Sequence, residues 1–390
     1  MTDAGQAAGV RTALVNGRVL AGADFVEGGA VVLSGGAIEA VVDAADLPAG
    51  IAREDLAGDW LLPGFIDAQV NGGGGVLFNN TPTLEGVRAI ARAHRRFGTT
   101  GLLPTLITDD LDAMRAGIDA VRAAIDAGEP GILGIHLEGP WLAEARKGTH
   151  DAGKFRVPDA DEITLATSLG NGVTLVTLAP ERVPAGTIRA LVAGGAIVAG
   201  GHTDADYAQA RAGIEAGITG FTHLYNAMSP LQGRAPGVVG AALEDRGSWL
   251  GVIADGVHVH AASLRVALAA KPRGKVFLVT DAMPMVGGED PSFDLYGETI
   301  TARDGVVRNA AGSLAGSALD MLTAVRNAVD MLGVPLAEAA RMAATYPADF
   351  LGLSASHGRI APGQQADLVR LDATLDLRGT WIGGRYQACP

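Results

Sequence analysis

The chain has 390 residues, 48% of them hydrophobic, which is enough for a large domain and a smaller one. The net charge is −13 and no Lys/Arg-rich run occurs, which argues against binding to nucleic acid or to an anionic membrane. The single cysteine, Cys389, cannot form an intrachain disulfide. Residues 1–10 lack a signal-peptide pattern, and no apolar run approaches the ~20 residues of a membrane helix. We therefore expect a soluble, cytoplasmic protein.

Both ends of the chain have the pattern of short β-strands. From Thr12 to Val42, and again after Ser356, short apolar runs alternate with glycine turns. Neither end is long enough to make a comfortable domain alone. We therefore expect the two ends, residues 1–58 and 355–390, to pair into one small β-sandwich domain, with residues 59–354 inserted as the large domain.

Between Trp60 and Leu353, short apolar runs alternate with Ala/Arg-rich helical stretches, the βα pattern of a parallel sheet. There are eight candidate strands. A spacing of about 25–40 residues per unit suits a (β/α)₈ barrel, whose active site lies at the carboxyl ends of the strands. The candidate strands are Leu61–Gln69, Gly101–Leu106, Ile132–Glu138, Val173–Leu178, Ala196–His202, Gly220–His223, Leu250–Ala254 and Val276–Asp281.

Polar residues gather at the ends of these candidate strands. They are Gln69 and Asn71, Glu138, His202, His223, Asp255 and His258, and Asp281. His202 and His223 are too far apart in sequence for one helix to present both, whereas adjacent barrel strands can. One glutamate and two imidazoles leave a coordination position open for water, as expected of catalytic zinc. A metal that lowers the pKa of water needs a carboxylate to take the proton, and Asp281 is placed for that role. The pattern predicts metal-assisted hydrolysis.

Each of these residues also has an ordinary explanation when taken alone. An isolated strand-end glutamate is usually an exposed loop acid, and an isolated histidine usually packs against its neighbours. The joint occurrence of Glu138, His202, His223 and Asp281 favours a metal site.

Other features of the sequence are weaker signals. His94 is expected on the surface of a helix, and His136 is as compatible with packing behind the site as with function. No Gly-x-Ser-x-Gly elbow occurs, and the glycine run at residues 72–75 lacks the lysine of a P-loop. We expect that run to let the backbone approach the site closely.

A series of motifs along the chain resembles the N-acetylglucosamine-6-phosphate deacetylase family of the amidohydrolase superfamily. The resemblance spans nearly the whole barrel, and the residues from Gly358 to Val369 resemble the closing β segment of the superfamily. The motifs are Pro63-Gly64-Phe65-Ile66-Asp67, His136-Leu137-Glu138-Gly139-Pro140, Lys147-Gly148-Thr149-His150, Gly201-His202-Thr203, Thr222-His223-Leu224-Tyr225-Asn226-Ala227-Met228, Asp255-Gly256-Val257-His258, Thr280-Asp281-Ala282-Met283 and Leu314-Ala315-Gly316-Ser317.

The resemblance implies a role for each motif. Glu138, His202 and His223 would hold one divalent metal per subunit, with zinc favoured. Asp281 would be the general base and later the acid for the leaving amine, and His150 would help to polarise the acetyl carbonyl. The residues implied to bind the amino sugar phosphate are Thr149, Asn226, Ala227, Arg234, His258, Leu314, Ala315 and Gly316.

The resemblance further suggests a homodimer in which the loop from Ser229 to Val238 reaches the neighbouring pocket. Arg234 would then contact the phosphate of the neighbouring site. A loop folded over its own barrel, or a solvated loop charge, fits the sequence equally well.

One departure from the wider superfamily concerns the first barrel strand. Binuclear members carry His-x-His there, whereas this chain has Gln69-Val70-Asn71, and amides are poor zinc ligands. We therefore expect a single metal.

The favoured hypothesis is the deacetylation of N-acetyl-D-glucosamine 6-phosphate to D-glucosamine 6-phosphate and acetate. The alternatives are the galactosamine epimer, or an amidohydrolase for another amide such as a cyclic amide or dipeptide. A catalytically silent sugar-phosphate-binding barrel is a different class, and Asp281 argues against it because binding needs no base.

Overall fold

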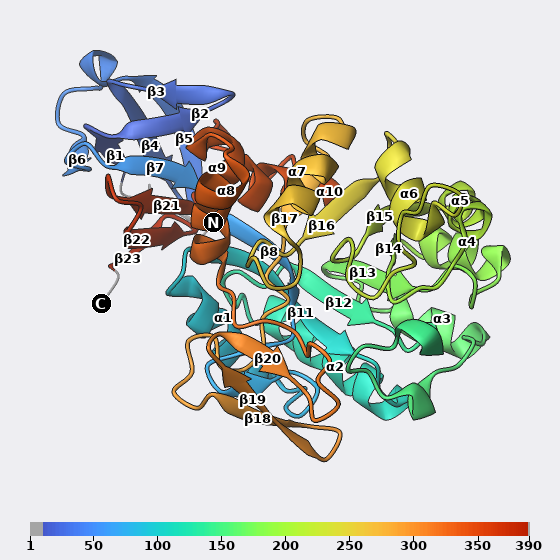
Figure 1. Ribbon diagram of the computed structural model, residues 1–390. Helices are drawn as coiled ribbons and strands as arrows, with labels where there is room; N and C mark the ends of the chain where they lie inside the picture. Colours follow the sequence, from blue (N-terminus) through green and yellow to red (C-terminus); the bar gives the residue numbers. More distant parts are fainter. Residues whose placement is uncertain (1–10, 389–390) are drawn as a thin grey trace.

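Eight parallel strands form the centre of the larger domain in the computed structural model, which describes residues 11–388 (Figure 1). Their order is β17-β16-β15-β14-β13-β12-β11-β8. A parallel bridge from Val70 to Ala282 and a 3.0 Å hydrogen bond from Asp281 N to Gln69 O join the first strand to the chain after the last. The strands are β8 (Phe65–Val70), β11 (Thr99–Ile107), β12 (Gly134–Glu138), β13 (Val173–Leu178), β14 (Ile197–Gly200), β15 (Ile218–Phe221), β16 (Trp249–Val252) and β17 (Val276–Leu278). The predicted (β/α)₈ barrel is confirmed.

A helix follows each barrel strand, and caps in the sequence define where several of these helices begin. Thr83 caps the first helix through Gly86 N, and Asp206 and Gln209 form a capping box at another. The helices are α1 (Leu84–Arg95), α2 (Leu111–Asp126), α3 (Ala160–Ala166), α4 (Ala185–Ala193), α5 (Tyr207–Ala216), α6 (Gly237–Glu244), α7 (Ala261–Ala270) and α8 (Met321–Leu332). Two further helices, α9 (Leu336–Ala343) and α10 (Thr345–Phe350), come after the last of them. None of the helices in residues 11–388 has the length and apolar character needed to span a membrane.

Small sheets complete the fold. The strands β18 (Ser292–Leu295), β19 (Glu298–Arg303) and β20 (Val306–Arg308) form an antiparallel insertion between β17 and α8, and a short hairpin, β9 (Gly72–Gly73) and β10 (Val76–Leu77), follows β8.

The small domain is built from both ends of the chain. One sheet has the order β5-β4-β1-β6 and the other has the order β23-β22-β21-β7-β2-β3. Side chains of both sheets, including Leu14, Val31 and Trp381, share one hydrophobic cluster. The strands are β1 (Thr12–Val15), β2 (Arg18–Ala21), β3 (Asp24–Val26), β4 (Gly29–Ser34), β5 (Ala37–Asp43), β6 (Ala52–Asp55), β7 (Trp60–Pro63), β21 (Leu368–Leu371), β22 (Leu377–Ile382) and β23 (Arg385–Ala388). The predicted pairing into a β-sandwich is confirmed, and the boundaries at 58/59 and 354/355 stay predictions.

The first predicted strand, Leu61–Gln69, is wrong as one element, because the apolar run divides at Gly64. Residues before it form β7, which pairs with β2 and β21 in the small domain, and residues after it form β8 in the barrel. A Cβ at Gly64 would lie 2.0 Å from Thr100 Oγ1, so only glycine fits where the chain crosses between the domains. One apolar run therefore serves two cores.

The prediction of a surface position for His94 is also wrong. His94 is fully buried on α1, and its Nε2 lies 2.9 Å from the carbonyl oxygen of Gly72. A Cβ at Gly73 would come within 2.8 Å of the His94 ring, so the glycine run lets α1 approach closely. Residues 1–10 and Cys389, to which the targeting and disulfide expectations refer, lie outside the described residues.

Candidate active site

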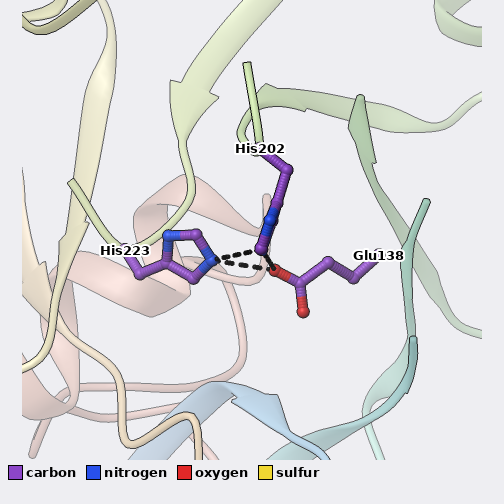
Figure 2. A group of neighbouring side chains, drawn as sticks. All are labelled: Glu138, His202 and His223. Atoms are coloured by element: carbon purple, nitrogen blue, oxygen red, sulfur yellow. Dashed lines mark hydrogen bonds and ion pairs between the residues drawn. The ribbon is translucent and has the colours of Figure 1, made fainter. Parts of the chain in front are cut away.

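Three predicted metal ligands converge at the carboxyl ends of three barrel strands (Figure 2). Glu138 ends β12, while His202 and His223 lie just beyond β14 and β15, and all three are buried. His223 Nε2 is 2.9 Å from Glu138 Oε1 and 3.1 Å from His202 Nε2, and His202 Nε2 is 3.3 Å from Glu138 Oε1. Ligands about 2.0–2.1 Å from a tetrahedral metal lie about 3.3 Å from one another, close to these separations. The donor set therefore fits a divalent metal.

Hydrogen bonding fixes the orientation of one imidazole. Nδ1 of His202 lies 2.9 Å from the carbonyl oxygen of Arg146, which can only accept, so Nδ1 carries the proton. The Nε2 lone pair is then directed at Glu138 and His223, as a metal ligand requires.

Unusual backbone conformations aim several of these side chains. His202 has φ = 47°, His223 has φ = 33° and Asp281 has φ = 54°, all in the left-handed region that non-glycine residues seldom adopt. Such conformations persist where the surroundings enforce them, commonly at functional sites. His202 and His223 each lie two residues beyond the end of the preceding strand, β14 or β15.

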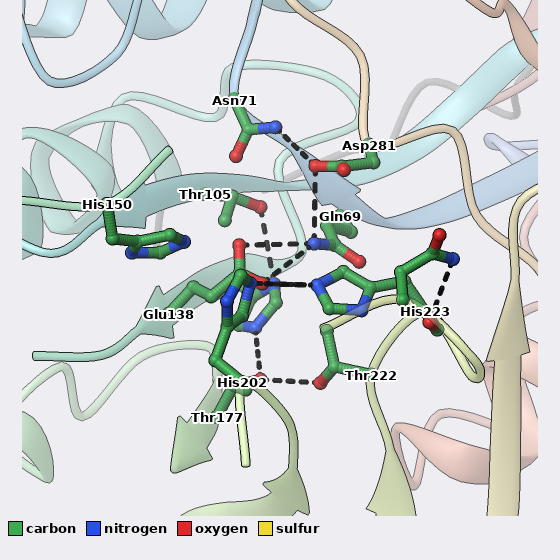
Figure 3. Close-up of polar contacts among 12 residues, drawn as sticks. Gln69, Asn71, Thr105, Glu138, His150, Thr177, His202, Thr222, His223 and Asp281 are labelled. Carbon is green, nitrogen blue, oxygen red and sulfur yellow. Dashed lines mark hydrogen bonds and ion pairs between the residues drawn. The ribbon is translucent and has the colours of Figure 1, made fainter. Parts of the chain in front are cut away.

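Asp281 is held by amides from the end of the first barrel strand (Figure 3). Asn71 Nδ2 donates to Asp281 Oδ1 at 2.6 Å, and Gln69 Nε2 lies 3.3 Å from the same oxygen. Gln69 Nε2 also lies 3.2 and 3.1 Å from the two oxygens of Glu138. Desolvation raises the pKa of Asp281, and the charge of Glu138 adds to the effect. The amides therefore act as donors to the carboxylates, and Asp281 is a group able to accept a proton.

His136 lies behind the cluster and does not line the cavity. Its Nε2 is 2.8 Å from Thr177 Oγ1 and its Nδ1 is 3.3 Å from Thr105 Oγ1. Burial lowers the pKa of His136 to about 4, so the ring is neutral. Of the two interpretations of His136, this position favours packing and support.

His150 presents a donor beside the cluster. Its ring centroid is 4.3 Å from that of His202, and burial, with the neighbouring His202 adding, lowers the pKa of His150 well below its ordinary value. The backbone N–H of Thr108 donates to Nδ1 at 3.4 Å, which places the proton of the neutral ring on Nε2. The Thr108 hydroxyl also lies 2.8 Å from Nδ1.

A cavity of about 370 Å³ opens over the metal ligands and Asp281. His150 lines it, as do most of the predicted substrate-binding residues, namely Thr149, Asn226, Ala227, His258, Leu314 and Gly316. His258 Nδ1 lies 2.6 Å from Asp255 Oδ2, which orients that ring. Ala315, between two lining residues, is instead buried in a hydrophobic cluster with Met283 and Phe293.

Arg234 lies apart from this cavity. It is exposed on the loop between β15 and α6 and does not line the cavity of its own chain. Sequence reasoning missed Arg146, which does line the cavity and whose Nε is 2.8 Å from Asp204 Oδ1. Its only signal in the sequence was a basic residue just before the motif that contains His150.

The barrel, the buried Glu-His-His cluster and the adjacent aspartate together define a metal-dependent hydrolase. Comparison with known proteins agrees with this class. Residues 60–386 match the amidohydrolase family, and residues 12–61 match the NagA composite domain.

Individual relatives indicate which group of the amidohydrolase family the chain resembles. The chain is 45% identical to an N-acetylgalactosamine-6-phosphate deacetylase of Shewanella sp. (strain ANA-3), over 85% of each chain. The crystal structure of N-acetylglucosamine-6-phosphate deacetylase from Pasteurella multocida is 36% identical, with a TM-score of 0.94 over 97% of this chain and 100% of that one. A mutant of the Mycobacterium smegmatis N-acetyl-D-glucosamine-6-phosphate deacetylase, in complex with N-acetyl-D-glucosamine-6-phosphate, is 35% identical, with a TM-score of 0.90 over 97% of this chain and 99% of that one. The chain belongs to the amidohydrolase family, in the group of N-acetylhexosamine-6-phosphate deacetylases.

Proposed function

We propose that this protein hydrolyses the acetamide of N-acetyl-D-glucosamine 6-phosphate, releasing acetate and D-glucosamine 6-phosphate. The observation that carries the proposal is that Asp281 and the Glu138–His202–His223 cluster line one cavity and are linked through Gln69. A hydrolase of amides needs an activated water, a group that takes its proton and a group that returns a proton to the amine.

Glu138, His202 and His223 would hold one divalent cation per subunit, with Zn²⁺ the choice that the mixed nitrogen and oxygen donor set favours. A cation held there supplies Lewis-acid chemistry, which polarises the acetyl carbonyl and activates water. The side-chain amides of Gln69 and Asn71 donate hydrogen bonds to carboxylates. They therefore do not replace the two histidines that hold the second metal in binuclear members.

Asp281 takes the proton of the attacking water and later delivers it to the leaving amine. Its raised pKa suits both steps, because a carboxyl group that binds a proton more readily is a better base and remains an adequate acid. Asn71 and Gln69 keep the carboxylate oriented through both steps. His150 Nε2–H donates to the acetyl oxygen as negative charge develops there.

The sugar phosphate would lie across the rest of the cavity. Asn226, Ala227 and His258 would contact the sugar and its phosphate, and Thr149 and the Leu314–Gly316 segment would form the opposite wall. The exposure of Arg234 outside its own cavity supports a homodimer in which this residue serves the neighbouring site. A guanidinium suits a phosphate because it can donate two parallel hydrogen bonds.

The second candidate is the galactosamine epimer, because the relative that is 45% identical is an N-acetylgalactosamine-6-phosphate deacetylase. The deciding experiment measures acetate release from both 6-phosphorylated epimers and from unphosphorylated N-acetylglucosamine. The proposal predicts the highest kcat/KM for N-acetylglucosamine 6-phosphate. A higher kcat/KM for the galactosamine epimer would make that epimer the substrate. Turnover of neither epimer would favour another amide as the substrate.

A further inference from the structure

We propose that a hollow between the two domains, at the end of the barrel opposite the active site, is a second binding site for a small phosphorylated metabolite. Its volume is about 620 Å³, and it is lined by Leu20, Gly22, Ala23 and Pro63 of the small domain together with residues of the barrel. Trp249 begins β16 and Lys275 directly precedes β17, so both lie at amino ends of barrel strands. The residues of the active site lie at the carboxyl ends, which separates the two cavities.

The charge of this hollow contrasts with that of the chain. The net charge of the protein is −13, yet the hollow is lined by four basic side chains and one carboxylate. They are Arg273, Lys275, Arg341 and Arg359, with Asp349 as the acid. Converging basic groups attract anions from solution, and low-dielectric walls strengthen that attraction.

Some of this positive charge is already compensated, which identifies the groups left for a ligand. Glu338 Oε2 pairs with Arg273 at 2.8 Å and with Arg341 at 2.9 Å. Asp349 pairs with Arg359, whose Nη2 reaches both carboxylate oxygens at 2.7 and 2.8 Å. These three arginines are therefore fixed in place.

Lys275 and one nitrogen of Arg359 remain without an anionic partner. Across residues 11–388, the side-chain ammonium of Lys275 makes no ion pair or hydrogen bond, and its Nζ lies 3.9 Å from the ring centroid of Trp249. Burial lowers the pKa of this ammonium group, although the charges of Asp245 and Asp349 act in the opposite direction. Arg359 Nη1 is buried and has no hydrogen-bond partner among the described residues. A phosphate bound beside Lys275 would supply the anionic partner that its ammonium group lacks.

The remaining walls indicate the kind of molecule that carries the phosphate. Leu20, Pro63, Ile360 and the Trp249 ring offer apolar surface, and Tyr346 and Thr345 add hydroxyl groups. The volume lies within the range of small-molecule sites, well beyond the needs of an inorganic ion. A phosphate monoester with a compact polar carbon skeleton, such as a sugar phosphate, matches this lining.

A ligand here would touch both domains. Arg341 on α9 already links them, because its Nη1 donates to the carbonyl oxygen of Ala23 in the small domain. Figure 1 shows α9 beside the small domain. A molecule that binds across this junction only in the folded state raises the unfolding temperature in a concentration-dependent way.

The test is isothermal titration of the metal-loaded protein with inorganic phosphate and, separately, with glucose 6-phosphate. Four proteins are compared: the native chain, Lys275→Gln, the charge-preserving Lys275→Arg, and Arg189→Gln on the exposed face of α4 as a matched control. Phosphate that binds in the active site contributes the same heat in the titrations of all four proteins, because the substituted positions lie outside that cavity. Unchanged acetate release in each variant shows that it is folded.

We expect Lys275→Gln to weaken the second binding event by about tenfold or more for both compounds, as loss of a charge-assisted contact implies. Lys275→Arg should restore most of the affinity, and Arg189→Gln should match the native chain. Tighter binding of glucose 6-phosphate than of inorganic phosphate supports a metabolite, and equal or weaker binding overturns that part of the proposal. Identical titrations of the native chain and Lys275→Gln overturn the site itself.

Discussion

Asn71 donates a 2.6 Å hydrogen bond to the Asp281 carboxylate across the seam where the barrel closes. Gln69, two residues earlier, connects the same carboxylate to Glu138. The end of β8 thus carries neutral donors that orient the proposed base and hold it close to a proposed metal ligand. This relationship makes the role of Asp281 directly testable.

Asp281→Asn should keep fold and metal content and yet lose most turnover. An amide can neither accept the proton of water nor return it to the amine, so we expect kcat to fall by roughly 10²–10⁴-fold, the usual range for acid–base catalysis. Steady-state acetate release measures the effect, with metal analysis of the same preparation as the control. Near-native kcat in a fully metallated variant would remove Asp281 from the mechanism.

The protein should bind one tightly held divalent metal per chain. Glu138, His202 and His223 form one donor set, and the amides of Gln69 and Asn71 act as donors to carboxylates. Elemental analysis of protein produced without added zinc measures the stoichiometry, and His202→Ala should reduce it toward zero. A ratio near two, with both ions in this cluster, would contradict the single-site account.

Arg234→Ala should impair phosphorylated substrates selectively. Loss of a charge-assisted contact of roughly 1.5–3 kcal/mol corresponds to about 10- to 150-fold in kcat/KM. The kcat/KM for unphosphorylated N-acetylglucosamine should fall little, and this sugar serves as the internal control in the same kinetic assay. An equal loss for both sugars would mean that Arg234 does not recognise the phosphate.

A subunit-mixing experiment tests whether Arg234 acts across a dimer. Chains carrying Asp281→Asn are mixed with chains carrying Arg234→Ala, and subunit exchange is verified before the assay. If the site is shared, each mixed dimer contains one complete site and recovers activity toward the phosphorylated sugar. No recovery would leave Arg234 with a role only in its own chain.

Asp67 should make folding stability depend on pH. Burial raises its pKa to about 7, although Thr280 Oγ1 donates to it at 2.5 Å. The folded protein therefore binds a proton more tightly than the unfolded chain. The contribution of Asp67 to the free energy of unfolding is full below about pH 4 and is lost as pH rises through 7. Over this interval the free energy of unfolding falls by up to about 1.4 kcal/mol per pH unit. Denaturation curves from pH 4 to 7 should show this decline.

The matching variant is Asp67→Asn, which is similar in size and does not ionise. Its unfolding free energy should vary less with pH over the same interval than that of the native chain. Asp24→Asn on the exposed strand β3 is the control and should retain the native slope. A native-like slope in Asp67→Asn would assign the effect to other groups.

The sequence predicted the barrel well because its strands are continuous apolar runs whose polar ends must meet at one edge. Glu138, His202 and His223 were predicted to lie together on this ground, and they do. The division at Gly64 was not predictable, because the requirement for glycine there comes from Thr100, on another strand. The burial of His94 likewise depends on a partner far away, Gly72.

Some of the cavity could not be predicted for a similar reason. Arg146 matters through its backbone carbonyl, which holds His202, and a carbonyl has no sequence signature. Ala315 and its neighbours differ in exposure although they are consecutive, because Ala315 packs in the hydrophobic cluster while Leu314 and Gly316 line the cavity.

The most direct test of the account is the kcat/KM for acetate release from N-acetyl-D-glucosamine 6-phosphate by the metal-loaded protein. Asp281→Asn of equal metal content is measured beside it. The account predicts efficient release by the native chain and a loss of roughly 10²–10⁴-fold in the variant. No release from this substrate or its galactosamine epimer, or equal release by both proteins, would contradict it.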